Sequence, residues 1–190
     1  MKNKIVLPFV ATMFLVLFVS VGSAFAWTLL SPLAGDITDR TIVGYSFGDN
    51  WYEGYCGGYV KKHTGVDVNA TLYEPVYAAY SGWVEKATTD DTWGGVVAID
   101  HSPTHTFLLT TVYWHIIPVI SEDSWVSKGD VIGYIAYLST GTHFHFGIRE
   151  AGYSYISYAG ALPQTNCGDY PAYPSYFLDP MSLQYEYNDN

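Results

Sequence analysis

Two histidines separated by one residue are the side chains best placed for chemistry, in the run His143-Phe144-His145-Phe146. In a β-strand, side chains two residues apart lie on the same face. His143 and His145 are therefore expected on one face, and Phe144, Phe146 and Ile148 on the other, against a core. Two imidazoles on an open face with apolar anchors behind them suit a metal or catalytic site. The alternative is a pair of exposed strand histidines, and the spacing alone leaves both open.

A second motif, His63-Thr64-Gly65-Val66-Asp67, supplies an imidazole and a carboxylate four residues apart. On a helix this spacing would place both on one face, but the three residues between them are poor helix formers. We therefore expect a turn or strand end that curves round one metal ion. Two histidines and one aspartate make the three-ligand set of a catalytic zinc site, which leaves one position for water. Zinc lowers the pKa of such a water towards 7 and polarises a carbonyl, as amide hydrolysis requires.

Three further histidines carry weaker signals. His115 ends the run Tyr113-Trp114-His115 and is expected on the same strand face as Thr111 and Tyr113. Its ordinary alternative is a hydrogen-bonded, partly buried histidine. His101 and His105 flank Pro103 in a loop, and we expect them at the surface or behind the site.

The chain that must position these residues is predicted to be all-β. Short β-branched and aromatic runs alternate with Gly, Ser and Asp turns, which is typical of a sandwich or barrel, and no helical period is visible. Val76–Tyr80 and Trp83–Ala87 are expected to form a hairpin-like pair around Ser81-Gly82. The other predicted strands are 95–100, 107–116, 131–136 and 143–149.

The start of the chain indicates export. Lys2 and Lys4 precede an apolar run to about Val21, followed by Ala24-Phe25-Ala26, which is the pattern of a cleaved signal peptide over residues 1–26. A retained membrane anchor is the alternative. Cleavage would move the net charge from −10 to about −12, which argues against binding to nucleic acid phosphates. We predict a lead-in segment at 27–54, a catalytic domain at 55–190, no membrane insertion after cleavage and a monomer.

Two cysteines, Cys56 and Cys167, would meet an oxidising compartment after export. A disulfide between them is plausible there. Two free thiols that never meet are the alternative, because separation in sequence says nothing about geometry. Neither cysteine has the close spacing of a cysteine-rich zinc site.

Taken in order, the motifs resemble those of the lysostaphin-like zinc endopeptidases, which cut peptidoglycan cross-bridges. The resemblance runs from about Val60 to Leu183, and its strength lies in the ordered set. The matching positions are His63 and Asp67; Val76, Ala78, Gly82 and Val84; Ile99 and His101; Tyr113 and His115; Val126, Gly129, Ile132 and Gly133; Ser139, Thr140, Gly141, His143, His145 and Phe146; and Asp179 and Pro180.

The resemblance implies a role for each site residue. It implies that His63, Asp67 and His145 bind Zn²⁺, and that His115 and His143 are catalytic histidines that orient the water, shuttle protons and stabilise the oxyanion. It also implies a compact antiparallel β-sheet core whose loops wall a groove for peptidoglycan peptide cross-bridges.

The chain departs from the family pattern in three places. The stretch between Ile132 and Ser139 is short, the loop from His101 to Thr110 is long, and Gly147 replaces an acidic residue that often follows the His-x-His-Phe strand. The two loops affect the expected substrate preference, and we expect little effect of Gly147 on the metal. Two other functions remain open: a silent wall-binding or hydrolase-activating member of the fold, and a zinc peptidase that cuts Gly-rich proteins. Residues 27–54 are also a candidate for a segment that occludes the site.

Overall fold

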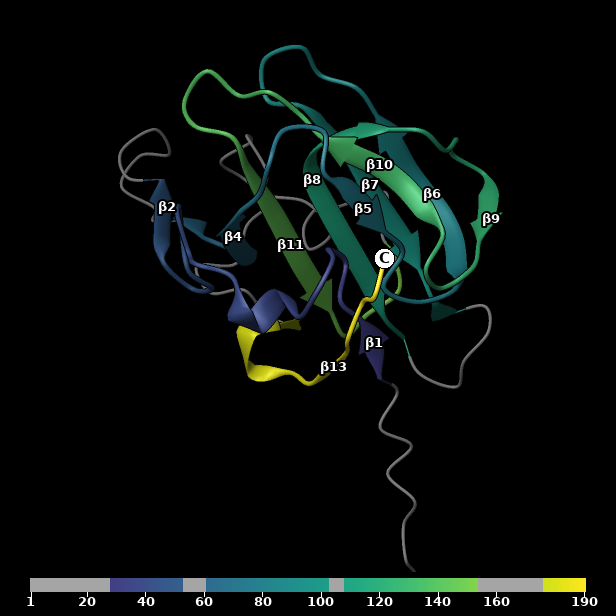
Figure 1. Ribbon diagram of the computed structural model, residues 1–190. Coiled ribbons are helices and arrows are strands. Elements are labelled where there is room, and N and C mark those ends of the chain that lie inside the picture. Colours follow the sequence, from purple (N-terminus) through teal and green to yellow (C-terminus); the bar gives the residue numbers. More distant parts are fainter. Residues whose placement is uncertain (1–27, 53–60, 103–107, 154–175) are drawn as a thin grey trace, which may run out of the picture.

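The computed structural model describes residues 28–52, 61–102, 108–153 and 176–190 (Figure 1). The predicted signal peptide, Cys56, Cys167 and His105 lie outside the described residues. Among the described residues, no helix is long and apolar enough to span a bilayer.

The described chain is built from β-strands, which confirms the predicted all-β class. Two 3₁₀ turns lie wholly within the described ranges, η1 (Ile37–Asp39) and η4 (Pro180–Ser182). The strands are β1 (Leu29–Leu30), β2 (Asn50–Tyr52), β3 (Lys61–Lys62), β4 (Gly65–Asn69), β5 (Pro75–Tyr77), β6 (Gly82–Thr88), β7 (Gly95–Asp100), β8 (Thr110–Pro118), β9 (Ser124–Val126), β10 (Val131–Ile135), β11 (His143–Arg149), β12 (Phe177–Leu178) and β13 (Tyr185–Glu186).

Nine of these strands form one antiparallel sheet, and six of the nine follow one another in the order β12-β11-β8-β7-β6-β9. Strand β4 pairs with β11, and β10 joins the sheet through β8 and also pairs with β5. The path ends at β12 and β9, so this sheet is open and not a closed barrel. Two smaller pairs complete the described fold: β2 with β3, and β1 with β13, which lie side by side in Figure 1 and join the two ends of the described chain in parallel.

The two faces of the main sheet pack against different sets of residues. Phe144, Phe146 and Ile148 are fully buried on one face, as predicted from their alternation with the histidines of β11. They belong to the main core together with Tyr113 and with Leu29, Leu33 and Ile37 from the start of the chain. The opposite face carries a small cluster of Val96, Ala98 and Val112, with Trp114 packed against it. The site histidines of β11 lie on this second face.

The predicted hairpin of Val76–Tyr80 with Trp83–Ala87 is wrong. Strand β5 pairs with β10, whereas β6 pairs with β7 and β9. Gly82 does not form a turn but begins β6, where a Cβ would lie 2.6 Å from the Asp100 carbonyl oxygen. The glycine therefore permits close strand packing, which in sequence looks the same as a turn signal.

Candidate metal centre

The three predicted ligands converge on one point. His63 Nε2 lies 3.2 Å from Asp67 Oδ1, and His145 Nδ1 lies 2.9 Å from both of these atoms. All three residues are buried, and they form a group of the kind that holds a metal ion. Three electron-pair donors so close together repel one another unless protons or a cation lie between them. The donor set of two imidazoles and one carboxylate suits a divalent metal such as zinc.

Strand pairing explains how residues 78 positions apart meet. In the antiparallel pair of β4 and β11, His145 lies directly opposite Asp67. Directly opposed side chains on one sheet face have Cβ atoms about 5 Å apart. His63 lies between β3 and β4 and approaches from the start of β4, whereas Asp67 lies within that strand.

The electrostatics of the group favour an ionised Asp67 beside a neutral His145. Burial opposes ionisation of Asp67, but hydrogen bonds with His145 and His63 outweigh it and hold its pKa well below the usual range. Burial lowers the pKa of His145 because desolvation disfavours the charged ring. A deprotonated ring nitrogen and a carboxylate are the protonation states that metal binding requires.

The other ring nitrogen of His145 has an unusual environment. Its Nε2 atom is buried and has no hydrogen-bond partner among the described residues. Gly147, on the same strand face, is a position from which a side chain could reach it, since a Cβ there would lie 3.7 Å from Nε2. Metal-binding histidines nearly always donate this second N–H to a carboxylate, carbonyl or water.

His115 reaches the site by a local break in β8. Its φ is +65°, a left-handed conformation that is uncommon for residues other than glycine. Trp114 and His115 consequently lie on the same face, with stacked rings whose centroids are 4.7 Å apart. The prediction that His115 shares a face with Thr111 and Tyr113 is wrong, because Tyr113 is fully buried against Phe144 and Phe146 on the opposite side.

The backbone of Trp93 and Gly94 fixes the ring of His115. Nδ1 of His115 donates to the Trp93 carbonyl oxygen at 2.6 Å, so Nε2 carries the free lone pair. Gly94, at φ +70°, passes so close that a Cβ would lie 2.9 Å from the Cα of His115. Burial and the neighbouring His143 lower the pKa of His115 to about 3, so the ring is neutral near pH 7.

His143 stands between His115 and the three converging residues. Its ring centroid is 4.4 Å from that of His115, and its Nε2 is 3.9 Å from Asp67 Oδ2. Nδ1 donates to the Gly141 carbonyl oxygen at 2.8 Å, which leaves the lone pair on Nε2. The structure thus brings together all five predicted site residues, with His115 and His143 beside the candidate ligands.

His101 lies elsewhere and is not a surface residue. It is fully buried, with Nδ1 3.0 Å from the Ser81 carbonyl oxygen and Nε2 2.8 Å from Thr111 Oγ1. Thr111 continues this chain of contacts to the hydroxyl of Tyr113. His101, just after β7, therefore links Ser81, just before β6, to Thr111 in β8.

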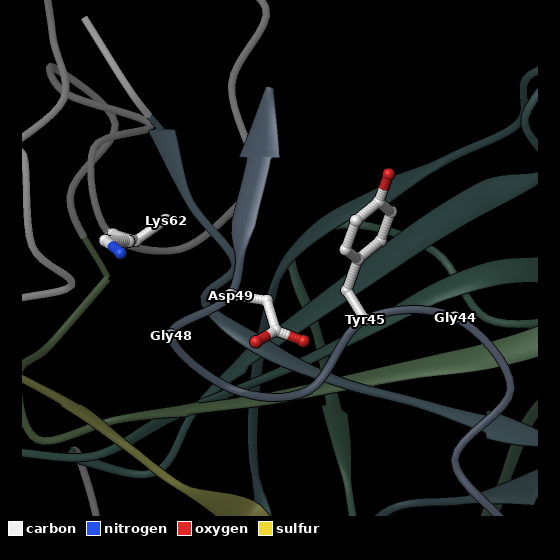
Figure 2. A pocket seen from close by; sticks show the side chains of 5 residues that line it. All are labelled: Gly44, Tyr45, Gly48, Asp49 and Lys62. Atoms are coloured by element: carbon white, nitrogen blue, oxygen red, sulfur yellow. The ribbon is translucent and has the colours of Figure 1, made fainter. Parts of the chain in front are cut away.

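A polar hollow of about 560 Å³ lies beside the candidate centre. Figure 2 shows the residues that line it. Its charged lining residues come from two segments, Asp49 before β2 and Lys62 in β3. Tyr45 adds an aromatic ring 5.7 Å from that of His63. Gly44 and Gly48 complete the lining. Sequence reasoning did not single out these residues, because they carry no motif.

The family model of peptidase family M23 matches residues 61–156, which contain all five site residues. The chain belongs to peptidase family M23. The resemblance predicted from the ordered motifs is thereby confirmed.

Among curated proteins, a relative of this M23 chain is the peptidoglycan DD-endopeptidase ShyC of Vibrio cholerae, 33% identical over 110 residues. The match covers 56% of the chain but only 24% of ShyC. Among solved structures, the chain is similar to a zinc-containing peptidase from Vibrio cholerae, at 22% identity over 63% of this chain and 36% of that one, with a TM-score of 0.48. It is also similar to the catalytic domain of lysostaphin from Staphylococcus simulans, at 22% identity over 73% and 87% of the two chains, with a TM-score of 0.47.

Proposed function

We propose that this chain is an exported zinc endopeptidase that hydrolyses peptide bonds in the cross-links of peptidoglycan. The observation that carries the proposal is the convergence of His63 Nε2, Asp67 Oδ1 and His145 Nδ1 beside two further histidines. Membership of a peptidase family supports the reaction class. The DD-endopeptidase name of ShyC supports a peptidoglycan substrate, although the chain spans about a quarter of that protein.

His63, Asp67 and His145 would hold the zinc ion. When bound, zinc supplies a Lewis acid that polarises the scissile carbonyl and makes a water acidic enough to deprotonate near neutral pH. His115, neutral and with its lone pair on Nε2, accepts a hydrogen bond from the attacking water and orients it. Because a base with a pKa of about 3 is weak, its contribution is orientation more than proton removal.

His143 is the better candidate for moving protons. It is partly exposed, its Nδ1 proton is held by the Gly141 carbonyl, and its Nε2 faces the Asp67 carboxylate. An imidazole so placed can take up a proton at Nε2 beside a negative charge and return it to the departing amine. As an imidazolium, it also stabilises the negative oxygen of the tetrahedral intermediate.

The test combines metal analysis with digestion of purified cell walls. Zinc-loaded protein should bind one ion per chain and release new amino termini from at least one wall type, identified by mass spectrometry of the fragments. Parallel digestion of pentaglycine and elastin separates a wall enzyme from one that prefers Gly-rich proteins. Zinc-loaded protein that releases no amino termini from any of these substrates would refute the proposal.

Export is part of the proposal, and the sequence of residues 1–26 supports it. Expression with the full leader should give a protein outside the cytoplasm whose first residue lies near Trp27. Amino-terminal sequencing measures this directly. A mature protein that keeps Met1 and stays with the membrane fraction would favour the anchored alternative.

A further inference from the structure

A segment that precedes the family-matched region runs alongside the residues that carry two of the candidate ligands. Thr41 accepts a backbone hydrogen bond from Asn69, Val43 and Tyr45 exchange bonds with Asp67, and Asp49 accepts one from the backbone of His63. Residues 41–49 therefore pair antiparallel with residues 63–69 and reach the metal centre from its outer side. The match to peptidase family M23 begins only at residue 61, so it assigns this segment no role.

Two contacts of this segment go to ligand side chains, and both engage the atom that faces away from the converging group. The backbone N–H of Tyr45 donates to Asp67 Oδ2 at 3.1 Å, while Oδ1 faces the two histidines. Nδ1 of His63 donates to the Ser46 carbonyl oxygen at 3.2 Å. A carbonyl only accepts, so this bond puts the His63 proton on Nδ1 and leaves the Nε2 lone pair for the centre.

Gly44 makes this approach possible. A Cβ at Gly44 would lie 2.6 Å from Asp67 Oδ2 and 2.8 Å from Asp67 Cβ, closer than real Cβ atoms come. The backbone of Tyr45 can therefore reach the carboxylate only because residue 44 has no side chain. The glycine serves close packing on a ligand rather than a turn.

We propose that Gly44, Tyr45 and Ser46 are positioning residues of the metal centre, which orient Asp67 and set the tautomer of His63 through backbone hydrogen bonds. The inference rests on the proposed function in that it takes His63, Asp67 and His145 as the metal ligands. Hydrogen bonds to the outer atoms of metal ligands fix their orientation and typically change metal affinity by about 10- to 100-fold when lost. In this chain the partners are backbone groups from a separate segment.

The test is the substitution Gly44→Ala, with Gly48→Ala as its matched control. Gly48 is in the same segment at φ +80° and has nothing within 4 Å of a Cβ, so alanine there strains the backbone without placing an atom against a ligand side chain. Its backbone N–H, which donates to the His63 carbonyl oxygen, is kept in alanine. Zinc affinity is measured by competition with a chromophoric chelator, and ligand geometry by the visible spectrum of the Co²⁺-loaded protein. We expect Gly44→Ala to weaken zinc binding by about 10- to 100-fold and alter the Co²⁺ spectrum. Gly48→Ala should keep the wild-type affinity and spectrum even if its melting temperature falls.

Folded Gly44→Ala protein with wild-type zinc affinity and an unchanged Co²⁺ spectrum would overturn the inference. If this variant does not fold, the imidazole ¹⁵N resonances of the zinc-loaded wild-type protein decide instead. The inference requires the proton of His63 on Nδ1, and a proton on Nε2 would overturn it. Wild-type protein that binds no zinc would contradict the proposed function itself. This outcome differs from a zinc-binding protein in which Gly44→Ala has no effect, which contradicts only the positioning role.

Discussion

The two sides of the candidate metal centre are built differently. On the β4 side, His63 and Asp67 each have an outer hydrogen bond to the backbone of Tyr45 or Ser46. On the β11 side, His145 is held by strand pairing and burial, and its outer nitrogen has no partner among the described residues. One side thus fixes its ligands by hydrogen bonds and the other by packing alone.

This difference shows two ways to orient a metal ligand. A fully buried ring opposite Asp67 has few other rotamers, so packing in the sheet can replace a hydrogen bond for orientation. Packing does not satisfy the buried N–H, whose lost hydrogen bond costs about 1–3 kcal/mol. We therefore expect that a substitution on the β11 side can raise zinc affinity, and that substitutions on the β4 side lower it.

The largest effect is expected from removing the packed ligand. His145→Ala should abolish stoichiometric zinc binding, since two ligands remain and zinc centres in catalytic proteins use three. Metal analysis after dialysis against a weak chelator measures this. His143→Ala is the control on the same strand face, and it should keep the ion because its Nε2 lies 3.9 Å from Asp67 Oδ2, outside the converging group. Retention of one zinc ion by His145→Ala would remove the residue from the ligand set.

The next largest effect is expected at a histidine that is not in the ligand set. His115→Ala should keep one zinc ion and lower kcat by about 10²-fold, the effect expected when a group that orients the attacking water is lost. Metal content and turnover are measured on the same preparation, which separates loss of chemistry from loss of the ion. Full turnover in this variant would show that the ring stacked on Trp114 is structural.

Strand positions on the β11 side could be predicted from sequence. Strands β7 and β11 have the predicted bounds, because an apolar run and a clean alternation set them locally. The face of His115 could not be predicted, because a single left-handed residue reverses the alternation and nothing in Tyr113-Trp114-His115 marks it. The pairing of β5 with β10 was missed for a related reason, since it depends on contacts distant in sequence.

On the β4 side, the ligands could be predicted from the sequence but the residues that orient them could not. His63 and Asp67 were found as a motif, but the segment that orients them acts through a backbone N–H and a carbonyl, which every residue type except proline possesses. The residue type that this contact requires is the glycine at position 44. A glycine in a loop-rich segment is common, so it does not point to a metal centre. Outer contacts made by backbone therefore leave almost no trace in a single sequence.

A smaller effect is expected from the hollow beside the β4 side. Lys62→Ala should raise KM for wall peptides by roughly three- to tenfold and leave kcat and zinc content nearly unchanged, since it removes a positive charge that attracts peptide carboxylates outside the reacting bond. Lys86→Ala is the control, because Lys86 lies on β6 and does not line this hollow. An unchanged KM in Lys62→Ala would show that substrate does not occupy this hollow.

The smallest effect is expected from giving the outer nitrogen of His145 a hydrogen-bond acceptor, which it lacks among the described residues. In Gly147→Ser a hydroxyl would be placed within reach of Nε2, since the Cβ would lie 3.7 Å from that atom. We expect zinc affinity to rise by about threefold to tenfold, as an outer hydrogen bond raises ligand basicity. Gly147→Ala is the matched control, because its Cβ meets the Thr64 carbonyl oxygen at the same 3.1 Å without offering an acceptor. The serine variant must bind zinc more tightly than the alanine variant. Equal affinities would mean that packing alone already supplies what the hydrogen bonds supply on the β4 side.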